Sequence, residues 1–109
     1  MSGGEYRVEV RGAGRVELAA FGLADAEHQV EKELADAWPG CRVEVLDVAR
    51  TDDRARIVEE FALRYRVRGT LPVAAATRKE AQSAALRSLR ERFADTRFSR
   101  VAWDVVEVE

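Results

Sequence analysis

The chain has 109 residues, of which 47% are hydrophobic and 35% charged, and its formal net charge at pH 7 is −2. This size and composition are typical of one folded domain spanning residues 1–109 and exclude a disordered chain. No apolar run is long enough to cross a bilayer and the N-terminus lacks the apolar core of a signal peptide, so we expect a cytoplasmic protein without a membrane partner. One cysteine and one histidine provide neither an internal disulfide nor a Cys/His set for zinc, so folding must rest on packing.

The first predicted element is a β-hairpin over residues 5–21. Apolar and charged residues alternate over residues 5–11 and the alternation resumes from residue 15, which is the period of a strand with one buried face. Gly12 and Gly14 lie between the two runs and indicate the turn of the hairpin.

A helix is predicted over residues 23–38, because apolar residues recur there with a helical period. Asp25 lies near its N-terminus, and Pro39-Gly40 ends it. A strand over residues 41–50 follows, in which the apolar residues change phase between Val45 and Leu46. Either a bulge or a strand buried on both faces would explain this change.

The second half begins with a segment, residues 54–60, whose pattern fits either a strand or a helical turn. Residues 61–68 alternate clearly, and a further strand over residues 71–75 contains Pro72, which favours an edge position or the first residues of a strand. Thr77 and Glu80 match a capping box at the start of a helix that runs to about Phe93. The last strand, residues 98–108, repeats the phase change of residues 41–50.

The order of these elements indicates one unit written twice, over residues 5–50 and 54–108. Each unit reads as two strands, a helix and a third strand. We therefore predict an α+β fold, a two-layer sandwich in which tandem ββαβ repeats form a mixed, mainly antiparallel sheet with two helices on one face. This is the layer arrangement of ferredoxin-like domains, and it implies no particular function.

Charge is distributed unequally between the two units. Residues 1–53 hold six basic and twelve acidic side chains, whereas residues 54–100 hold twelve basic and five acidic ones. Six basic residues are the candidates for contact with an anion or a nucleic acid, three from the strand before Gly69 and three from the second helix: Arg64, Arg66, Arg68, Lys79, Arg87 and Arg90. The alternative is that these residues only solvate an open sheet face and the outer side of a helix.

Part of the second unit resembles double-stranded RNA binding domains. The segments "FALRYRVRG" and "TRKEAQSAALRSL", within residues 61–89, are similar to a strand and to the last helix of that family. The resemblance implies a structured RNA partner and a helix, three strands and a helix over residues 23–94. The family's Gly-Pro-x-His element has no counterpart in this chain.

No catalytic, cofactor or metal residues are predicted, and we do not expect an enzyme. His28 has Glu27 and Glu31 as neighbours on the polar side of a helix, and Cys41 has no histidine near it in sequence. No Ser-His-Asp set, GxGxxG sequence or P-loop occurs.

The leading hypothesis is a non-enzymatic binding or assembly module that forms a homo-oligomer or binds another protein. It rests on residues 41–50 and 98–108, which are apolar in both phases and so suggest sheet surface that a second copy covers. The alternative is a protein that binds structured RNA through the arginine-rich second unit.

Overall fold

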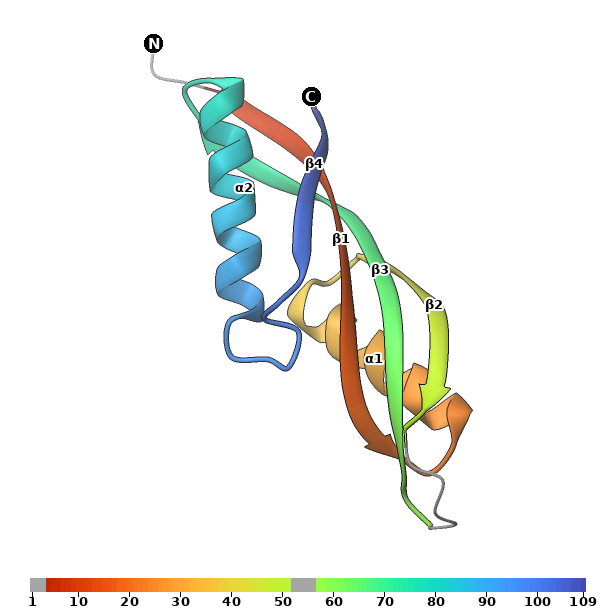
Figure 1. Cartoon of the computed structure of the whole chain (residues 1–109). Helices are drawn as coiled ribbons and strands as arrows, with labels where there is room; N and C mark the ends of the chain where they lie inside the picture. Colours follow the sequence, from red (N-terminus) through yellow and green to blue (C-terminus); the bar gives the residue numbers. More distant parts are fainter. Residues whose placement is uncertain (1–3, 52–56) are drawn as a thin grey trace.

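The computed structural model describes residues 4–51 and 57–109. Its elements in chain order are β1 (Gly4–Ala20), α1 (Leu23–Ala37), β2 (Arg42–Arg50), β3 (Glu59–Ala75), α2 (Arg78–Phe93) and β4 (Ala102–Val108). The strands form one sheet in the order β2-β3-β1-β4, and all neighbouring pairs are antiparallel (Figure 1). The α+β class is confirmed, as a curled sheet of four antiparallel strands with two helices.

The hairpin expected over residues 5–21 is not formed, and the strands expected over residues 61–68 and 71–75 are not separate. β1 and β3 are each a single strand of 17 residues, and they pair with each other from Gly4 opposite Ala75 to Ala20 opposite Glu59. The sheet therefore has four strands instead of six, and each half of the chain runs strand, helix, strand instead of ββαβ. The undecided segment 54–60 lies partly outside the described residues, and its described end enters β3 at Glu59.

Glycines that resemble turn residues lie inside the long strands because aromatic rings approach the backbone there. A Cβ atom on Gly12 would lie 2.6 Å from the Val101 side chain and 2.7 Å from the Trp103 ring. A Cβ atom on Gly69 would lie 2.7 Å from the Trp38 ring. These positions need a small residue for close packing, as glycines inside strands often do.

Both shorter strands contain a β-bulge, which explains their change of phase. The pairing of β2 with β3 shifts between Val45 and Asp47, and that of β4 with β1 shifts between Val105 and Glu107. Leu46 and Val106 are thus the extra residues, and the bulge predicted as one alternative for residues 41–50 is confirmed. Neither strand is buried on both faces, so the reason first given for a covered second sheet face no longer holds.

One face of the sheet carries the core, and both helices pack against it. The even-numbered residues of β1 and the odd-numbered residues of β3 point to this face. The predicted apolar stripes of the helices are buried there and belong to the same hydrophobic cluster: Ala26, Val30 and Leu34 from α1, and Ala81, Ala85, Leu89 and Phe93 from α2.

α2 begins with a side-chain cap, whereas α1 has none and only a hydrogen bond from the preceding chain to its first turn. The Glu80 backbone N–H donates to Thr77 Oγ1 at 3.2 Å, and the Glu80 carboxylate accepts from the Ala76 backbone N–H at 3.1 Å, as the capping pattern predicted. At the start of α1, Asp25 Oδ2 accepts from the Phe21 backbone N–H at 3.0 Å. The N-terminus of α2 is therefore already capped by the side chains of Thr77 and Glu80.

The molecule is elongated, with principal extents of 63 × 22 × 18 Å. α1 contacts β1, β2 and β3, whereas α2 contacts β1, β3 and β4, so the two helices cover different parts of the long strands (Figure 1). Trp103 joins the two parts, because its ring lies 5.9 Å from that of Trp38 and 5.2 Å from that of Phe93. None of the helices in residues 4–51 and 57–109 is long and apolar enough to cross a membrane.

Candidate binding surfaces

The open face of the sheet, on the side away from the helices, carries three of the six predicted basic residues. Arg64, Arg66 and Arg68 occupy alternate positions of β3 and are exposed. Residues of the two flanking strands that lie opposite them share this face, among them Glu44 of β2 and Arg11 of β1. The alternation in the sequence therefore correctly predicted that these arginines share the open face of the sheet.

Carboxylates from neighbouring strands pair with the arginines of this face. Arg64 Nη1 lies 2.9 Å from Asp47 Oδ2, and Arg68 donates two hydrogen bonds, of 3.2 and 3.0 Å, to the Glu9 carboxylate. Arg66 Nη1 lies 3.8 Å from Glu44 Oε2. The hydrogen bond and the charge of Glu9 raise the pKa of Arg68, which stays charged.

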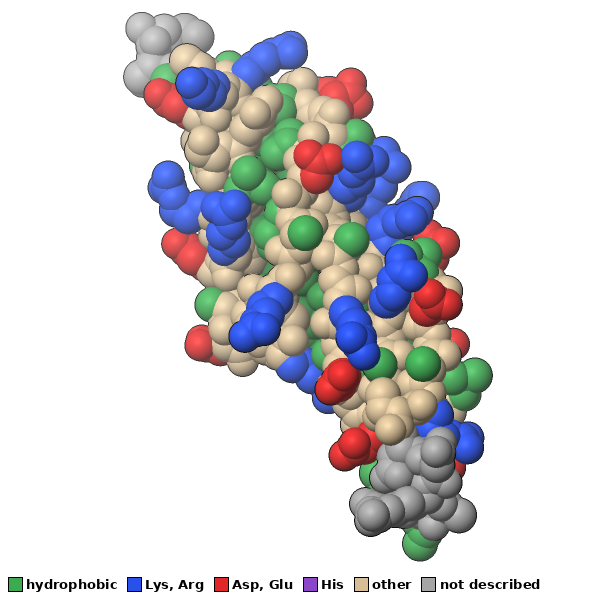
Figure 2. Space-filling model, in the orientation of Figure 1, with side chains coloured by type: hydrophobic (Ala, Val, Ile, Leu, Met, Phe, Trp, Pro, Cys, Tyr) green, Lys and Arg blue, Asp and Glu red, His purple; other side chains and the backbone are tan. Residues whose placement is uncertain are grey.

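The same pattern continues on β1, where Arg11 pairs with Asp104 at 2.9 Å and Arg15 with Glu17 at 3.3 Å. Figure 2 shows basic and acidic side chains interleaved over the surface that the long strands present in that view. An incoming phosphate would have to compete with a carboxylate at each of these arginines. The open face is therefore a mosaic of ion pairs and not a basic patch.

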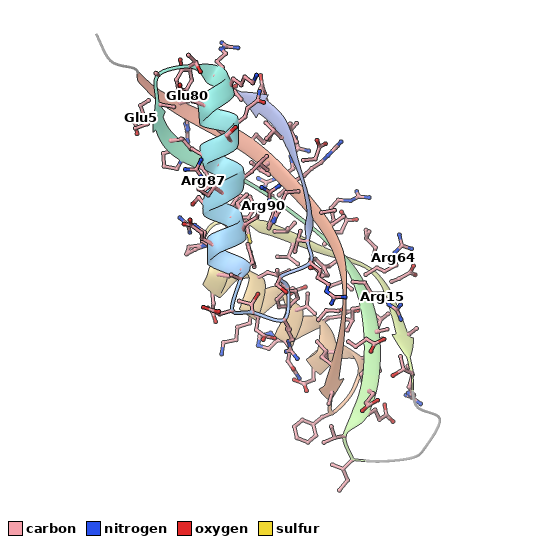
Figure 3. The ribbon with its side chains drawn as sticks, turned by 60° about the vertical axis from the view of Figure 1, so that its left-hand side comes forward. Glu5, Arg15, Arg64, Glu80, Arg87 and Arg90 are labelled. Atoms are coloured by element: carbon pink, nitrogen blue, oxygen red, sulfur yellow. The ribbon has the colours of Figure 1, made fainter. Side chains whose placement is uncertain are left out.

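The other three predicted residues lie on α2 and form what we call the basic stripe: Lys79, Arg87 and Arg90. All three side chains are exposed. Within residues 4–51 and 57–109, no carboxylate oxygen lies within 4.0 Å of their charged nitrogens, in contrast to the arginines of the open sheet face. Figure 3 shows Arg87 and Arg90 on α2, and Arg64 and Arg15 on the other side of the long strands. The six predicted residues therefore belong to two separate surfaces.

Two shallow hollows of about 430 Å³ each flank the basic stripe and share Ser83 and Arg87 in their linings. The first is also lined by Leu86, Arg90, Glu91 and Ala94. The second is also lined by Lys79, Glu80, Ala84 and two residues at the end of β3, Ala74 and Ala75. None of these lining residues is aromatic, and most of those between the charged side chains are small.

One edge of β1 is a candidate surface that sequence reasoning did not identify. β4 pairs with β1 only from Val8 to Ala13, so no strand of the described chain lies beside residues 14–20 on that side. We call this segment the open β1 edge. This edge exists because β4 begins opposite Ala13 of β1. The local sequence pattern of β1 or of β4 does not indicate where that pairing begins.

The hydrogen-bonding groups of the open β1 edge follow from the pairing of β1 with the end of the chain. Arg7 and Glu109 exchange two backbone hydrogen bonds of 2.8 Å, so odd-numbered residues of β1 direct their N–H and C=O groups toward this side. Arg15, Glu17 and Ala19 are the odd-numbered residues of the edge. The carbonyl oxygen of Ala19 accepts a hydrogen bond from the Gln29 side chain at 3.2 Å, which leaves the groups of Arg15 and Glu17 for a partner.

Apart from residues 4–6 of β1, a stretch of only three residues, the remaining edges of the described sheet each contain a feature that hinders the addition of another strand. β2 has its bulge at Leu46 and β4 has its bulge at Val106. β3 extends beyond β2 as an edge over residues 69–75, where Pro72 lies, as its position in the sequence predicted. The open β1 edge contains neither a proline nor a bulge.

The residues weighed for catalysis lie apart from one another. His28 is exposed on α1, while Cys41 is half-buried and its Sγ atom lies 3.7 Å from the Leu34 carbonyl oxygen. Burial raises the pKa of the Cys41 thiol, which disfavours the nucleophilic thiolate. Within the described residues, no group of three or more His, Cys, Asp or Glu side chains is arranged to hold a metal ion.

Comparisons with known proteins assign no family. No family model matches the chain, and no curated protein matches its sequence. The helix-strand-strand-helix order of residues 23–93 also departs from the three strands that the double-stranded RNA binding domain resemblance implied.

Three solved structures give low-scoring partial similarities. A hydantoinase/carbamoylase family amidase from Burkholderia ambifaria is 15% identical with a TM-score of 0.33, over 99% of this chain and 29% of that one. Aminopeptidase PepT from Bacillus cereus is 11% identical with a TM-score of 0.34, over 96% of this chain and 29% of that one. The de novo designed protein Foldit4 is 14% identical with a TM-score of 0.25, over 97% of both chains. The chain spans less than a third of the length of the two natural proteins, and scores this low establish no shared fold or activity.

Proposed function

We propose that this chain is a non-enzymatic assembly module that forms a homodimer by pairing the open β1 edges of two copies. The observation that carries the proposal is that this edge is the longest unpaired stretch of the described sheet without a bulge or proline, since the other such stretch of β1, residues 4–6, has only three residues. Addition of a strand from a second copy would satisfy the outward backbone groups of Arg15 and Glu17. When the same edge pairs symmetrically in both copies, the edge is fully used and the assembly stops at a dimer.

Charge selects the register of this pairing. If the twofold axis passes through Val16, antiparallel pairing places Arg15 opposite Glu17 of the second copy, and the same contact occurs twice. If the axis passed through Glu17, two carboxylates would face each other, and the pairing would need the Ala19 carbonyl that Gln29 already occupies. The first register covers residues 14–18 and ends before the first β4 partner, Ala13.

The alternative function, binding of structured RNA by all six basic residues, has less support from the geometry. It would require one RNA to contact the open sheet face and α2 together, although these lie on different sides of the molecule. Stacking of bases on the sheet also lacks a platform, because Phe61 and Tyr65 are buried on the helix side.

Charge exchange tests the dimer and its register. Arg15→Glu alone places two glutamates opposite each other at both contacts, and Glu17→Arg alone does the same with arginines. We expect each to raise the dimer dissociation constant about tenfold or more, from the loss of two attractive pairs and the gain of repulsion. The double variant R15E/E17R restores both contacts and should restore the dimer. Arg7→Glu, on the same face of β1 outside the edge, is the control.

A backbone substitution tests the edge independently of charge. Glu17→Pro removes an outward amide that β3 does not use, so the protomer should still fold while the dimer dissociates. Sedimentation equilibrium from about 1 to 100 µM gives the dissociation constant of each variant, and circular dichroism checks that each is folded. A wild-type chain that is monomeric throughout this range would overturn the proposal. Unchanged dimerisation of both single charge variants and of Glu17→Pro would place the interface elsewhere.

A further inference from the structure

The cations of the basic stripe have no carboxylate partner within the described residues, unlike Arg64, Arg66 and Arg68 of β3. On the open sheet face, ion pairs of 2.9 to 3.8 Å already neutralise five guanidinium groups, those of Arg11, Arg15, Arg64, Arg66 and Arg68. Two carboxylates lie near the stripe. Glu80 is hydrogen-bonded to the Ala76 backbone N–H, and Glu91 lines the hollow that contains Arg90. The stripe therefore keeps a positive charge that a ligand can use.

The spacing of the stripe indicates an extended ligand. Lys79 and Arg90 are eleven residues apart on one helix, which corresponds to a separation of about 16 Å along its axis. A single phosphate or carboxylate cannot contact both ends of such a row. A polymer with regularly spaced negative charges can contact all three side chains.

The lining of the hollows indicates how closely such a polymer can approach. Between Lys79 and Arg87, the surface consists of Ser83, Ala84 and the two alanines at the end of β3, whose short side chains leave the helix surface accessible. Arg87 lines both hollows and lies between the other two cations in sequence. The fork of a guanidinium group matches two oxygens of one phosphate, and two of the three side chains in the stripe are arginines.

The same lining argues against recognition of bases. Proteins that bind single strands stack bases on exposed aromatic rings, and no aromatic residue lines either hollow. Contact with phosphates alone carries no sequence information. A duplex, which presents its phosphates outward and keeps its bases stacked, fits this surface better than a single strand does.

We infer that the basic stripe of α2 binds the phosphate backbone of double-stranded nucleic acid without sequence preference. This activity goes beyond the proposed homodimer and uses residues that lie outside the open β1 edge. Lys79, Arg87 and Arg90 each contact one phosphate group. In a dimer two stripes are present, so one duplex can be held by two copies of α2 or two duplexes can be joined.

Binding of the full-length protein to labelled 20-base-pair duplexes tests the inference, with fluorescence anisotropy as the readout. The three phosphate contacts of one bound stripe predict that the logarithm of the association constant falls with the logarithm of the salt concentration with a slope of roughly −2.7, which is about a forty-fold loss between about 50 and 200 mM salt. Two duplexes of unrelated sequence should bind equally, and matched RNA and DNA duplexes show which backbone is preferred. R87Q/R90Q should weaken binding at least tenfold and reduce the slope by about 1.8. Arg64→Gln, which removes one ion-paired cation from the open sheet face, should change little.

Several results would overturn the inference. No binding at low salt would do so, as would an equal loss with Arg64→Gln, since the effect would then be one of total charge. Displacement of the duplex by poly-glutamate as readily as by an unlabelled duplex would indicate an acidic protein partner instead. The Glu17→Pro variant separates the two proposals, because it removes the dimer and leaves the stripe intact. Weak binding by this variant that still depends on Arg87 and Arg90 supports the stripe whether or not the wild-type chain dimerises.

Discussion

Gly12, Gly14 and Gly69 lie in the middle of the two long strands, where a glycine ordinarily weakens a strand. Each makes room for a ring that arrives from a distant part of the chain. A Cβ atom on Gly14, for example, would lie 2.5 Å from the hydroxyl oxygen of Tyr65. Tyr65 is buried, and this burial raises its pKa to about 12, so its hydroxyl stays protonated beside the backbone. The missing side chains thus allow the aromatic part of the core to reach the sheet.

We predict that Gly12→Ala destabilises the protein by about 1 to 3 kcal/mol, because the new methyl group would overlap the side chains of Val101 and Trp103. Urea denaturation measures the change in the free energy of unfolding. Gly4→Ala is the matched control in the same strand, since no atom lies within 4 Å of the added Cβ, and it should change stability by less than about 0.5 kcal/mol. Equal effects of the two substitutions would mean that intrinsic strand preference, and not the ring contacts, determines the cost.

These glycines also explain why the hairpin over residues 5–21 was predicted wrongly. Glycine pairs between alternating runs are a strong local signal for a turn, and nothing within residues 5–21 contradicts it. The contacts that remove the ambiguity come from Tyr65 and Trp103, which lie far along the chain. A local pattern could not contain that information.

At the scale of whole elements, the sequence was most informative where local chemistry determines structure. The helical stripes, except for the exposed Leu23, the Thr77 cap and the edge position of Pro72 were correct because they depend on residues within a few positions of one another. The phase change in residues 41–50 left a bulge as one of two alternatives, and the bulge at Leu46 is the one that is formed.

The candidate surfaces were predictable only in part, because they depend on which strands become neighbours. Alternation placed Arg64, Arg66 and Arg68 on the open face, but the carboxylates that pair with them belong to β1 and β2. The open β1 edge likewise exists only because β4 pairs with no residue beyond Ala13. Pairing and register are properties of the assembled sheet.

The apolar stripe of α2 can be tested by truncating two leucines. Leu89 is fully buried against the sheet, so we expect Leu89→Ala to cost about 2 to 5 kcal/mol in the free energy of unfolding. Leu86, on the same helix, is only partly buried, and Leu86→Ala should cost clearly less. Urea denaturation of both variants gives the comparison, and a loss below about 0.5 kcal/mol for Leu89→Ala would show that this stripe does not form the core.

At the scale of the whole molecule, the long strands determine the shape. A strand of 17 residues is about 53 Å long, and the two helices cover different stretches of the β1–β3 ribbon. The core is continuous through the cluster of Trp38, Phe93 and Trp103 at the junction. One consequence is that surfaces at the two ends, the open β1 edge near α1 and the basic stripe on α2, can act separately.

The elongated shape leads to a prediction for the protein in solution. A compact domain of about 100 residues has a radius of gyration of about 13 Å, whereas the Cα atoms of this structure give 16.3 Å. Small-angle X-ray scattering of the Glu17→Pro variant, in which the proposed dimer is absent, should therefore give a radius of at least 16 Å, since hydration and side chains add to the Cα value. The dimeric wild-type chain should give a larger one. A value near 13 Å for a folded monomer would mean that the two ends approach each other, and the separation between the open β1 edge and the basic stripe would then be lost.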